Sequence, residues 1–197
     1  MDVRKPAERG AFTLIELLVV ITIIAILMGL LFPVFQGAQN QAKRTQAKND
    51  VTQIVTAVDA FYTEYGQYPV AGTADTTVGG ASAPNDKLFD ALRGIDVTVN
   101  PKAISFLTAP DVKDPLNPRA GIGTTTGKGQ YFDPWGTPYF VAIDGNYDDQ
   151  IANPYSSNAG SPDLRLGAIS WSIGADKKTD AADKKSADSD DDVISWQ

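Results

Sequence analysis

A single apolar run near the N-terminus constrains this chain more than any other feature. Residues 12–35 read FTLIELLVVITIIAILMGLLFPVF, and Glu16 is the only charged residue among these 24. A helix of this length spans about 36 Å, enough to cross a hydrocarbon core of about 30 Å. Residues 1–11 form a polar leader with basic residues at Arg4, Lys5 and Arg9. Because basic flanks stay in the cytoplasm, we expect the remainder of the chain to lie outside the membrane.

Two ordinary alternatives explain this run less well. A secretory signal peptide has an apolar stretch of about 7–15 residues followed by a small-residue cleavage site. This run is longer and no such site follows it. A plain signal anchor fits the length but not Glu16, since a charged carboxylate in a spanning helix costs on the order of 2.5–3.5 kcal/mol. No basic residue lies in the run, so we expect the partner of Glu16 to come from elsewhere.

The composition favours a structural or binding role. The 197-residue chain has no cysteine and no histidine, which excludes disulfides, thiol chemistry and the usual general base and zinc ligand. Its net charge of −7 argues against nucleic acid as a partner, because phosphate binding requires a basic surface. No nucleophile and base stand out, so we expect no catalytic residue and no enzymatic activity.

The apolar run is expected to continue as an amphipathic helix from Gln36 to Tyr65. Apolar residues recur there at spacings of three and four, with polar residues between them. Such a helix needs a sheet or a similar surface to cover its apolar side. Gly66 and Pro69 are expected to end it. The apolar positions are Ala47, Val51, Ile54, Val55, Val58, Phe61, Tyr62 and Tyr65.

Strand-like sequence is concentrated in the last third of the chain. Asp133–Pro138 predicts a tight turn before a strand that begins at Tyr139, and Leu164–Ile173 and Val193–Trp196 predict two more strands. The economical architecture is α+β, with one long N-terminal helix packed on a small antiparallel sheet.

The middle of the chain is less informative. Ala71–Lys87 and Asn117–Gln130 are rich in Gly, Thr, Ser, Ala and Pro, which predicts loops. Short helices are expected between them at Asp86–Arg93 and Ala103–Leu107. We therefore divide the chain into a leader (1–11), a membrane helix (12–35), its amphipathic continuation (36–69), a variable region (70–130) and a sheet region with an acidic loop (131–197).

The string GAFTLIELLVV at residues 10–20 closely resembles the cleavage and methylation signal of type IV prepilins and type II secretion pseudopilins. The resemblance implies a pilin-like fold, and a membrane peptidase that cuts between Ala11 and Phe12 and methylates the new amine. It also implies that Glu16 pairs with the amine of a neighbouring subunit and so sets the register between subunits. That family normally has glycine before the cut, so cleavage after Gly10 remains the alternative.

Pro33 lies near the far end of the apolar run. Proline removes a backbone donor and kinks or opens a helix. The resemblance implies local melting of the helix at Pro33 when subunits pack in a filament, and a simple bend where the helix leaves the bilayer is the alternative.

A second resemblance concerns the C-terminal third. DPWGTPY at residues 133–139 is similar to the start of the sheet in the G-type major pseudopilins of type II secretion. Those proteins carry calcium in a late acidic loop, and this chain has the aspartate-rich segment GADKKTDAADKKSADSDDD between Ile173 and Val193. Calcium takes six to eight oxygen ligands. The resemblance implies ligands from the carbonyl of Ile173, from Asp176, and from two of Asp188, Asp190 and Asp192. A solvated, mobile loop without a metal is the alternative.

A further acidic segment runs from Asp144 to Asp149. Its Asp-x-Asn-x-Asp start is similar to an EF-hand loop, but the glycine and the twelfth-position glutamate of that motif are absent. We expect a hairpin-type turn here, with calcium as the alternative.

The resemblance implies a structural subunit of a type II secretion pseudopilus. Its partners would be copies of itself, minor pseudopilins, the prepilin peptidase and the inner-membrane assembly platform. Before assembly, the chain would span the inner membrane once, with its leader in the cytoplasm and its soluble domain in the periplasm. A type IV pilin of a surface fibre is the alternative function, and a lone membrane-anchored binding protein is a further one.

Overall fold

The computed structural model describes residues 12–70, 72–123, 129–156, 159–178 and 191–196, without the side chains of residues 31–34. The chain divides into two compact units, one that ends at Gln41 and one that begins at Ala42. We call the second the globular unit.

One long helix, α1 (Leu14–Tyr65, 52 residues), contributes to both units. Its large apolar side chains are exposed from Leu14 to Leu30 and become buried only from Ala47 onward. Gly66 ends the helix at φ +68°, and its N–H donates to the carbonyl of Tyr62 at 2.8 Å. The predicted change from an apolar to an amphipathic helix is confirmed.

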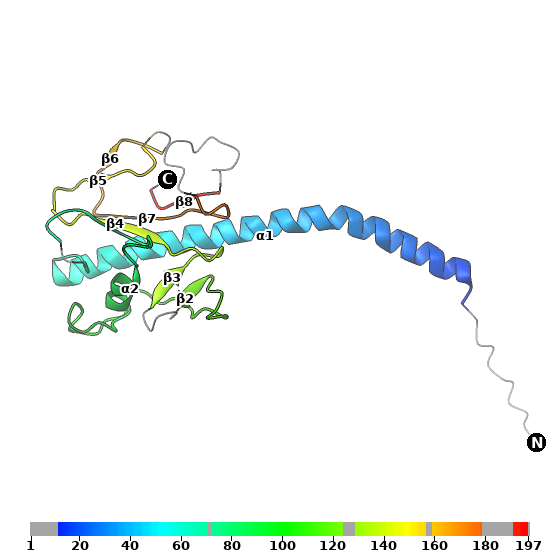
Figure 1. The fold of residues 1–197 in the computed structure, drawn as a ribbon, viewed down its shortest axis with the longest axis horizontal. Coiled ribbons are helices and arrows are strands. Elements are labelled where there is room, and N and C mark those ends of the chain that lie inside the picture. Colours follow the sequence, from blue (N-terminus) through cyan, green and yellow to red (C-terminus); the bar gives the residue numbers. More distant parts are fainter. Residues whose placement is uncertain (1–11, 71, 124–128, 157–158, 179–190, 197) are drawn as a thin grey trace, which may run out of the picture. The chain divides into compact units, whose positions relative to one another are not determined.

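A four-stranded antiparallel sheet packs on the second half of α1 (Figure 1). The strand order is β1-β4-β7-β8, and the pairs have Val78 opposite Val141, Phe140 opposite Trp171, and Trp171 opposite Ile194. The α+β architecture is therefore confirmed. The strands are β1 (Thr76–Val78), β4 (Phe140–Ile143), β7 (Ala168–Ser172) and β8 (Val193–Ile194).

The sheet is covered on both faces. Val141 and Ile143 point to the α1 side, where they join a core with Val51, Ile54 and Phe61. The alternate residues point to the other side, because side chains alternate along a strand. There, a second cluster is formed by Ala142, Ile169, Trp171 and Ile194 with Tyr155 and Ala159.

The remaining elements are short. The helix α2 (Asp86–Leu92) agrees with the prediction, and the pairs β2 (Gly121–Gly123) with β3 (Gln130–Phe132) and β5 (Ile151–Ala152) with β6 (Asp163–Leu164) form two small antiparallel sheets.

Three sequence-based expectations about the elements are wrong. Residues 103–107 form no helix, because Ala103 has φ +50° and the side chain of Asn100 bonds both backbone groups of Ile104. Leu164–Ile173 is not one strand, since β6 ends at Leu164 and β7 begins at Ala168. The loop expected at Ala71–Lys87 contains β1, and the one at Asn117–Gln130 contains β2.

Candidate functional site

The start of α1 forms a hydrogen-bonded cap around Glu16. The backbone N–H and the hydroxyl of Thr13 donate to Oε2 of Glu16 at 2.8 and 2.7 Å, and the N–H of Glu16 donates to Oγ1 of Thr13 at 3.3 Å. This reciprocal pair is a capping box, which satisfies donors that a helix N-terminus leaves unpaired. The sequence analysis missed this role of Thr13, although its spacing of three from Glu16 is the signature of the motif.

The predicted cleavage site lies at the edge of the described residues. Phe12 is 75% exposed and directly precedes Thr13, whereas Ala11 and the alternative cut after Gly10 lie outside the part of the chain that the structure describes. Processing between Ala11 and Phe12 stays a prediction.

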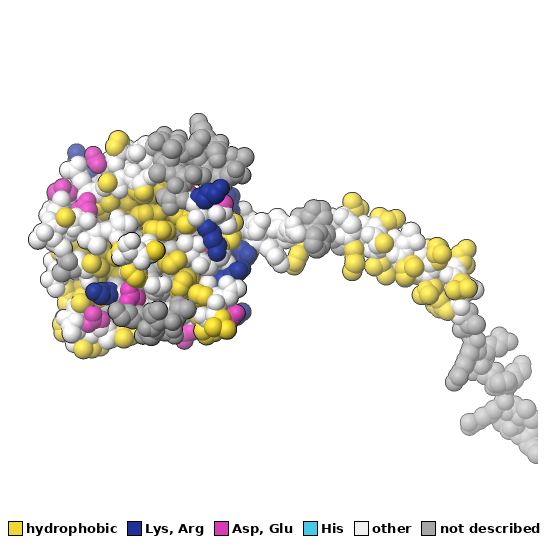
Figure 2. Space-filling model, in the orientation of Figure 1, with side chains coloured by type: hydrophobic (Ala, Val, Ile, Leu, Met, Phe, Trp, Pro, Cys, Tyr) yellow, Lys and Arg dark blue, Asp and Glu magenta, His cyan; other side chains and the backbone are white. Residues whose placement is uncertain are grey.

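The first turns of α1 expose a continuous apolar surface (Figure 2). By length and composition, α1 can cross a membrane, with a mean hydropathy of 3.0 over its most apolar window and none of that window buried. A surface of this size is stable only against lipid or against other apolar helices. Within the described residues of the first unit, no other element covers it.

The backbone of α1 is helical through position 33. The predicted effect of Pro33 concerns the packed filament, so it stays a prediction.

Three carboxylates converge where β7 leaves the sheet and β8 enters it. One oxygen from each of Asp176, Asp191 and Asp192 lies within 4.8 Å of the others. We call these three residues the aspartate cluster. Oδ2 of Asp191 accepts the backbone N–H groups of Ala175 and Asp176, the latter at 3.0 Å. The chain is thereby folded back around the Asp191 side chain.

The position of Gly174 makes this close approach possible. Gly174 has φ +64°, and an added Cβ would lie 2.6 Å from Cγ of Asp191. Its N–H donates to Oγ of Ser172, whose hydroxyl donates to the buried carboxylate of Asp133 at 2.6 Å. The cluster is therefore connected to the turn that precedes β4.

The aspartate cluster fits a cation. Oδ2 of Asp176 and Oδ1 of Asp191 are buried, and within the described part of the chain no hydrogen-bond donor reaches them. Buried carboxylate oxygens without donors are costly unless a positive charge is close. The three carboxylates also supply the oxygen ligands that calcium prefers.

The predicted ligand set stays a prediction, and the structure places only some of its residues together. Asp176 and Asp192 lie in the cluster, and Ile173 lies between β7 and Gly174. Asp188 and Asp190 lie outside the described residues. Asp191 was missed, because nothing in the spacing of a run of adjacent aspartates distinguishes one from the next.

The segment from Asp144 to Asp149 is a turn, as expected. Asp144 is buried, and its carboxylate accepts the backbone N–H groups of Tyr147 at 2.7 Å, Asp148 at 3.3 Å and Asp149 at 2.9 Å. Because backbone N–H groups of the turn bond both oxygens of this carboxylate, the segment does not need a metal to satisfy it.

Comparison with known proteins agrees with this geometry. The profile of the prokaryotic N-terminal methylation motif matches residues 8–32. Type II secretion system core protein G of Aeromonas hydrophila is 27% identical over 140 residues, which are 71% of this chain and 77% of that protein. Core protein G of Pseudomonas aeruginosa is 39% identical over 62 residues, 32% of this chain and 44% of that protein.

A type IV pilin also matches the chain. The major pilin protein PilA of Myxococcus xanthus is 40% identical over 63 residues, 32% of this chain and 28% of that protein. The chain therefore matches less than half the length of the Pseudomonas and Myxococcus proteins. No solved structure matches the chain significantly.

The N-terminal motif, the long exposed helix and the small sheet define a pilin-like protein. More particularly, the chain carries the prokaryotic N-terminal methylation motif, and its sequence is similar to core protein G of type II secretion systems. The proteins of this class are structural subunits, so the expectation that the chain is not an enzyme is confirmed.

Proposed function

We propose that this chain is a structural subunit of a type II secretion pseudopilus, which assembles through its N-terminal helix and drives export of folded proteins across the outer membrane. The observation that carries the proposal is the exposed apolar surface of α1 directly after the methylation motif. Before assembly the surface lies in the inner membrane, and after assembly the helices of neighbouring subunits cover it.

The proposed partners follow from this assembly. They are further copies of the chain, minor pseudopilins, the inner-membrane assembly platform and the prepilin peptidase. The peptidase cuts between Ala11 and Phe12 and methylates Phe12. The charge of Glu16 then pairs with the amine of a neighbouring subunit, and Pro33 allows the helix to open locally in the filament.

We also propose that the aspartate cluster holds a calcium ion. Asp176, Asp191 and Asp192 supply carboxylate oxygens, and Asp188, Asp190 and the carbonyl of Ile173 are the further candidates to complete six to eight ligands. Bound calcium neutralises the carboxylates and holds the end of β7 to the start of β8, and disulfides provide such cross-links in other small exported domains. This chain has no cysteine.

The test is the intact mass and N-terminal sequence of the chain from its host, with and without the prepilin peptidase. N-methylphenylalanine at residue 12, present only with the peptidase, is the expected result. A product that begins at Ala11 would show that the peptidase cuts after Gly10, which is the alternative site. A full-length chain in both strains would contradict filament processing.

A type IV pilin of a surface fibre is the second candidate, and the similarity to the Myxococcus pilin favours it. Deletion of the chain separates the two functions. Loss of secreted proteins with surface fibres unchanged supports the pseudopilus, whereas loss of fibres with secretion unchanged supports the pilin.

A further inference from the structure

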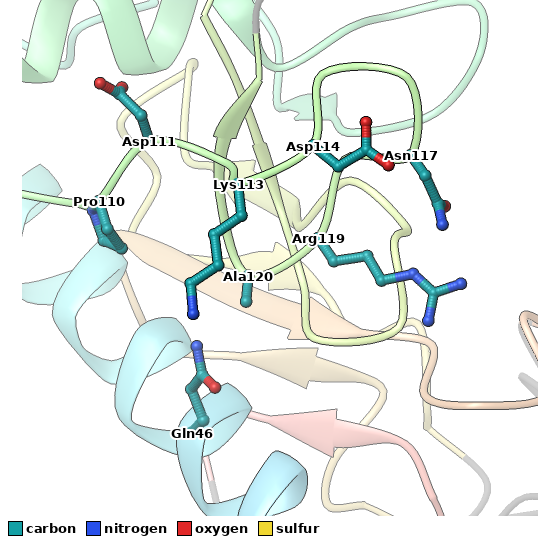
Figure 3. A pocket seen from close by; sticks show the side chains of 8 residues that line it. All are labelled: Gln46, Pro110, Asp111, Lys113, Asp114, Asn117, Arg119 and Ala120. Atoms are coloured by element: carbon teal, nitrogen blue, oxygen red, sulfur yellow. The ribbon is translucent and has the colours of Figure 1, made fainter.

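A cavity of about 610 Å³ opens on the globular unit between α1 and the segment that leads to β2. Its lining includes the cations Lys113 and Arg119 and the amides Gln46 and Asn117 (Figure 3). We call this cavity the basic hollow. In Figure 3 the Lys113 side chain extends toward Gln46 of α1.

The cations of the basic hollow share its lining with two carboxylates but form no ion pair with them. Within the described residues, neither Lys113 nor Arg119 lies within ion-pair distance of a carboxylate. Asp111 and Asp114 also line the hollow, but their carboxylates point away from the Lys113 ammonium (Figure 3). Asp111 pairs instead with Arg93 at 3.9 Å, and Oδ1 of Asp114 accepts the N–H of Leu116 at 3.0 Å.

The same end of the globular unit carries two more cations. Lys43 and Arg44 are the first charged residues after Glu16 in the sequence. Lys43 lies three positions before Gln46, hence on the same side of α1 as the hollow. Figure 2 shows Lys and Arg side chains gathered at the end of the globular unit where α1 enters it.

Lys43 and Arg44 lie close in sequence to the apolar run at residues 12–35. Lys43 follows Phe35 by eight residues, which is about 12 Å of helix. A lysine or arginine side chain adds several ångströms of reach toward the headgroups. An anionic surface is felt over a Debye length of about 8 Å. The chain as a whole has a net charge of −7, so these cations are the groups of the globular unit that an anionic surface attracts.

We propose that Lys43, Arg44 and the basic hollow bind the phosphate groups of anionic phospholipids on the outer face of the membrane. Arginine forks and lysine ammonium groups are the side chains that bind phosphate. Docking holds the globular unit in one orientation on the membrane before the subunit enters a filament. This inference rests on the membrane insertion in the proposed function.

The experiment is hydrogen exchange on the full chain in lipid nanodiscs. One set contains phosphatidylcholine alone, and the other also contains phosphatidylglycerol. Exchange of residues 43–48 and 113–120 is expected to slow only with phosphatidylglycerol. The double variant Lys113→Gln/Arg119→Gln should weaken docking about 25-fold, since each basic residue near an anionic surface contributes about fivefold.

A matched control removes two exposed cations elsewhere. Lys87→Gln/Arg165→Gln, on α2 and just after β6, makes the same change in net charge and should keep the protection. Loss of protection in both double variants would mean that net charge alone is responsible, and the assigned site would be wrong.

Four outcomes overturn the inference in different ways. Equal exchange in the two disc types, with the chain inserted in both, removes the lipid site and leaves membrane insertion intact. Protection by inorganic phosphate in phosphatidylcholine discs makes the hollow a general phosphate site. If the protection disappears in discs that each hold a single chain, the cations contact a second copy of the chain and not lipid. Failure to enter either disc contradicts the membrane anchor itself.

Discussion

One substitution can distinguish the observed role of Glu16 from its proposed one. Its carboxylate caps α1 through Thr13, and its charge is proposed to pair with a neighbouring subunit. Glu16→Gln keeps the cap, because glutamine is also accepted at this position of a capping box. It removes the charge, so we expect normal processing at Phe12 and a loss of filaments on the order of tenfold or more.

The measurement is the amount of sheared, pelleted filament, with the mass of the processed subunit as its control. Thr13→Ala makes the converse change, since it weakens the cap and keeps the charge. Normal filament yield in Glu16→Gln would show that the carboxylate acts only as a cap.

A substitution at Gly174 tests the geometry of the aspartate cluster by adding one Cβ atom. In Gly174→Ala, the added atom lies 2.6 Å from Cγ of Asp191 and the backbone stays at φ +64°. The left-handed conformation alone costs an L-residue about 1–2 kcal/mol, and the contact adds to that. We expect a larger loss of unfolding free energy than this, together with weaker metal binding.

Gly66→Ala is the matched control for Gly174→Ala. Gly66 has φ +68°, and its Cβ would meet nothing within 4 Å. The difference between the two variants in denaturant unfolding isolates the contact with Asp191. Equal losses would mean that Asp191 moves aside and that the cluster is not rigid.

At the scale of elements, the contact between α1 and the sheet contains a buried acid. Asp50 is 8% exposed, and Oδ2 accepts the hydroxyl of Tyr139 at 2.7 Å. Burial raises the pKa of Asp50 above its ordinary value of 3.8, although the hydrogen bonds from Tyr139 and Tyr131 oppose the rise. Because the folded state then binds its proton more tightly than the unfolded state, stability falls as the pH rises from 3.8 through the raised pKa.

Asp50→Asn should remove that loss. The amide oxygen can still accept the Tyr139 hydroxyl, and no charge is buried. We expect the variant to gain stability relative to the unchanged chain as the pH rises through this window, measured by denaturant unfolding in detergent. Asp163→Asn, an exposed carboxylate, controls for net charge. A difference that does not vary with pH would show that Asp50 is not buried as a charge.

The elements that could be predicted are those with their own hydrophobic pattern. The helix α1 carries its apolar run and its three-and-four spacing, and β4, β7 and β8 each contain Val, Ile, Phe or Trp. By contrast, β1 reads Thr-Thr-Val and β2 reads Gly-Ile-Gly. Such short strands exist because β4 and β3 offer them backbone partners, which a local pattern does not reveal.

The candidate sites also differ in whether a local sequence pattern predicts them. The spacing of Thr13 and Glu16 contains the capping box, whereas Asp191 is distinguished only by the turn at Gly174 that brings two N–H groups to its carboxylate. The basic hollow combines Gln46 with Lys113 and Arg119. Residues so far apart in sequence are brought together only by the tertiary fold.

At the scale of the whole molecule, the aspartate cluster lies where the last strand joins the sheet. The strand β8 begins directly after Asp192 and pairs with β7 through two residues. Val193 belongs to the hydrophobic core against α1, and Ile194 belongs to the hydrophobic cluster on the opposite face of the sheet. Repulsion among three carboxylates beside this short strand is expected to weaken both cores, and the proposed cation would stabilise both.

We therefore expect calcium to raise the thermal unfolding temperature of the full chain. A ligand at 100 times its Kd adds about 2.7 kcal/mol, which for a chain of this size corresponds to a rise of roughly 5–10 °C. A chelator should reverse the rise, and Asp191→Asn or Asp192→Ala should abolish it. Asp148→Asn, in the exposed part of the other acidic turn, should keep it. An unfolding temperature that is the same with calcium and with chelator would remove the metal, and the three carboxylates would then have to be separated by water alone.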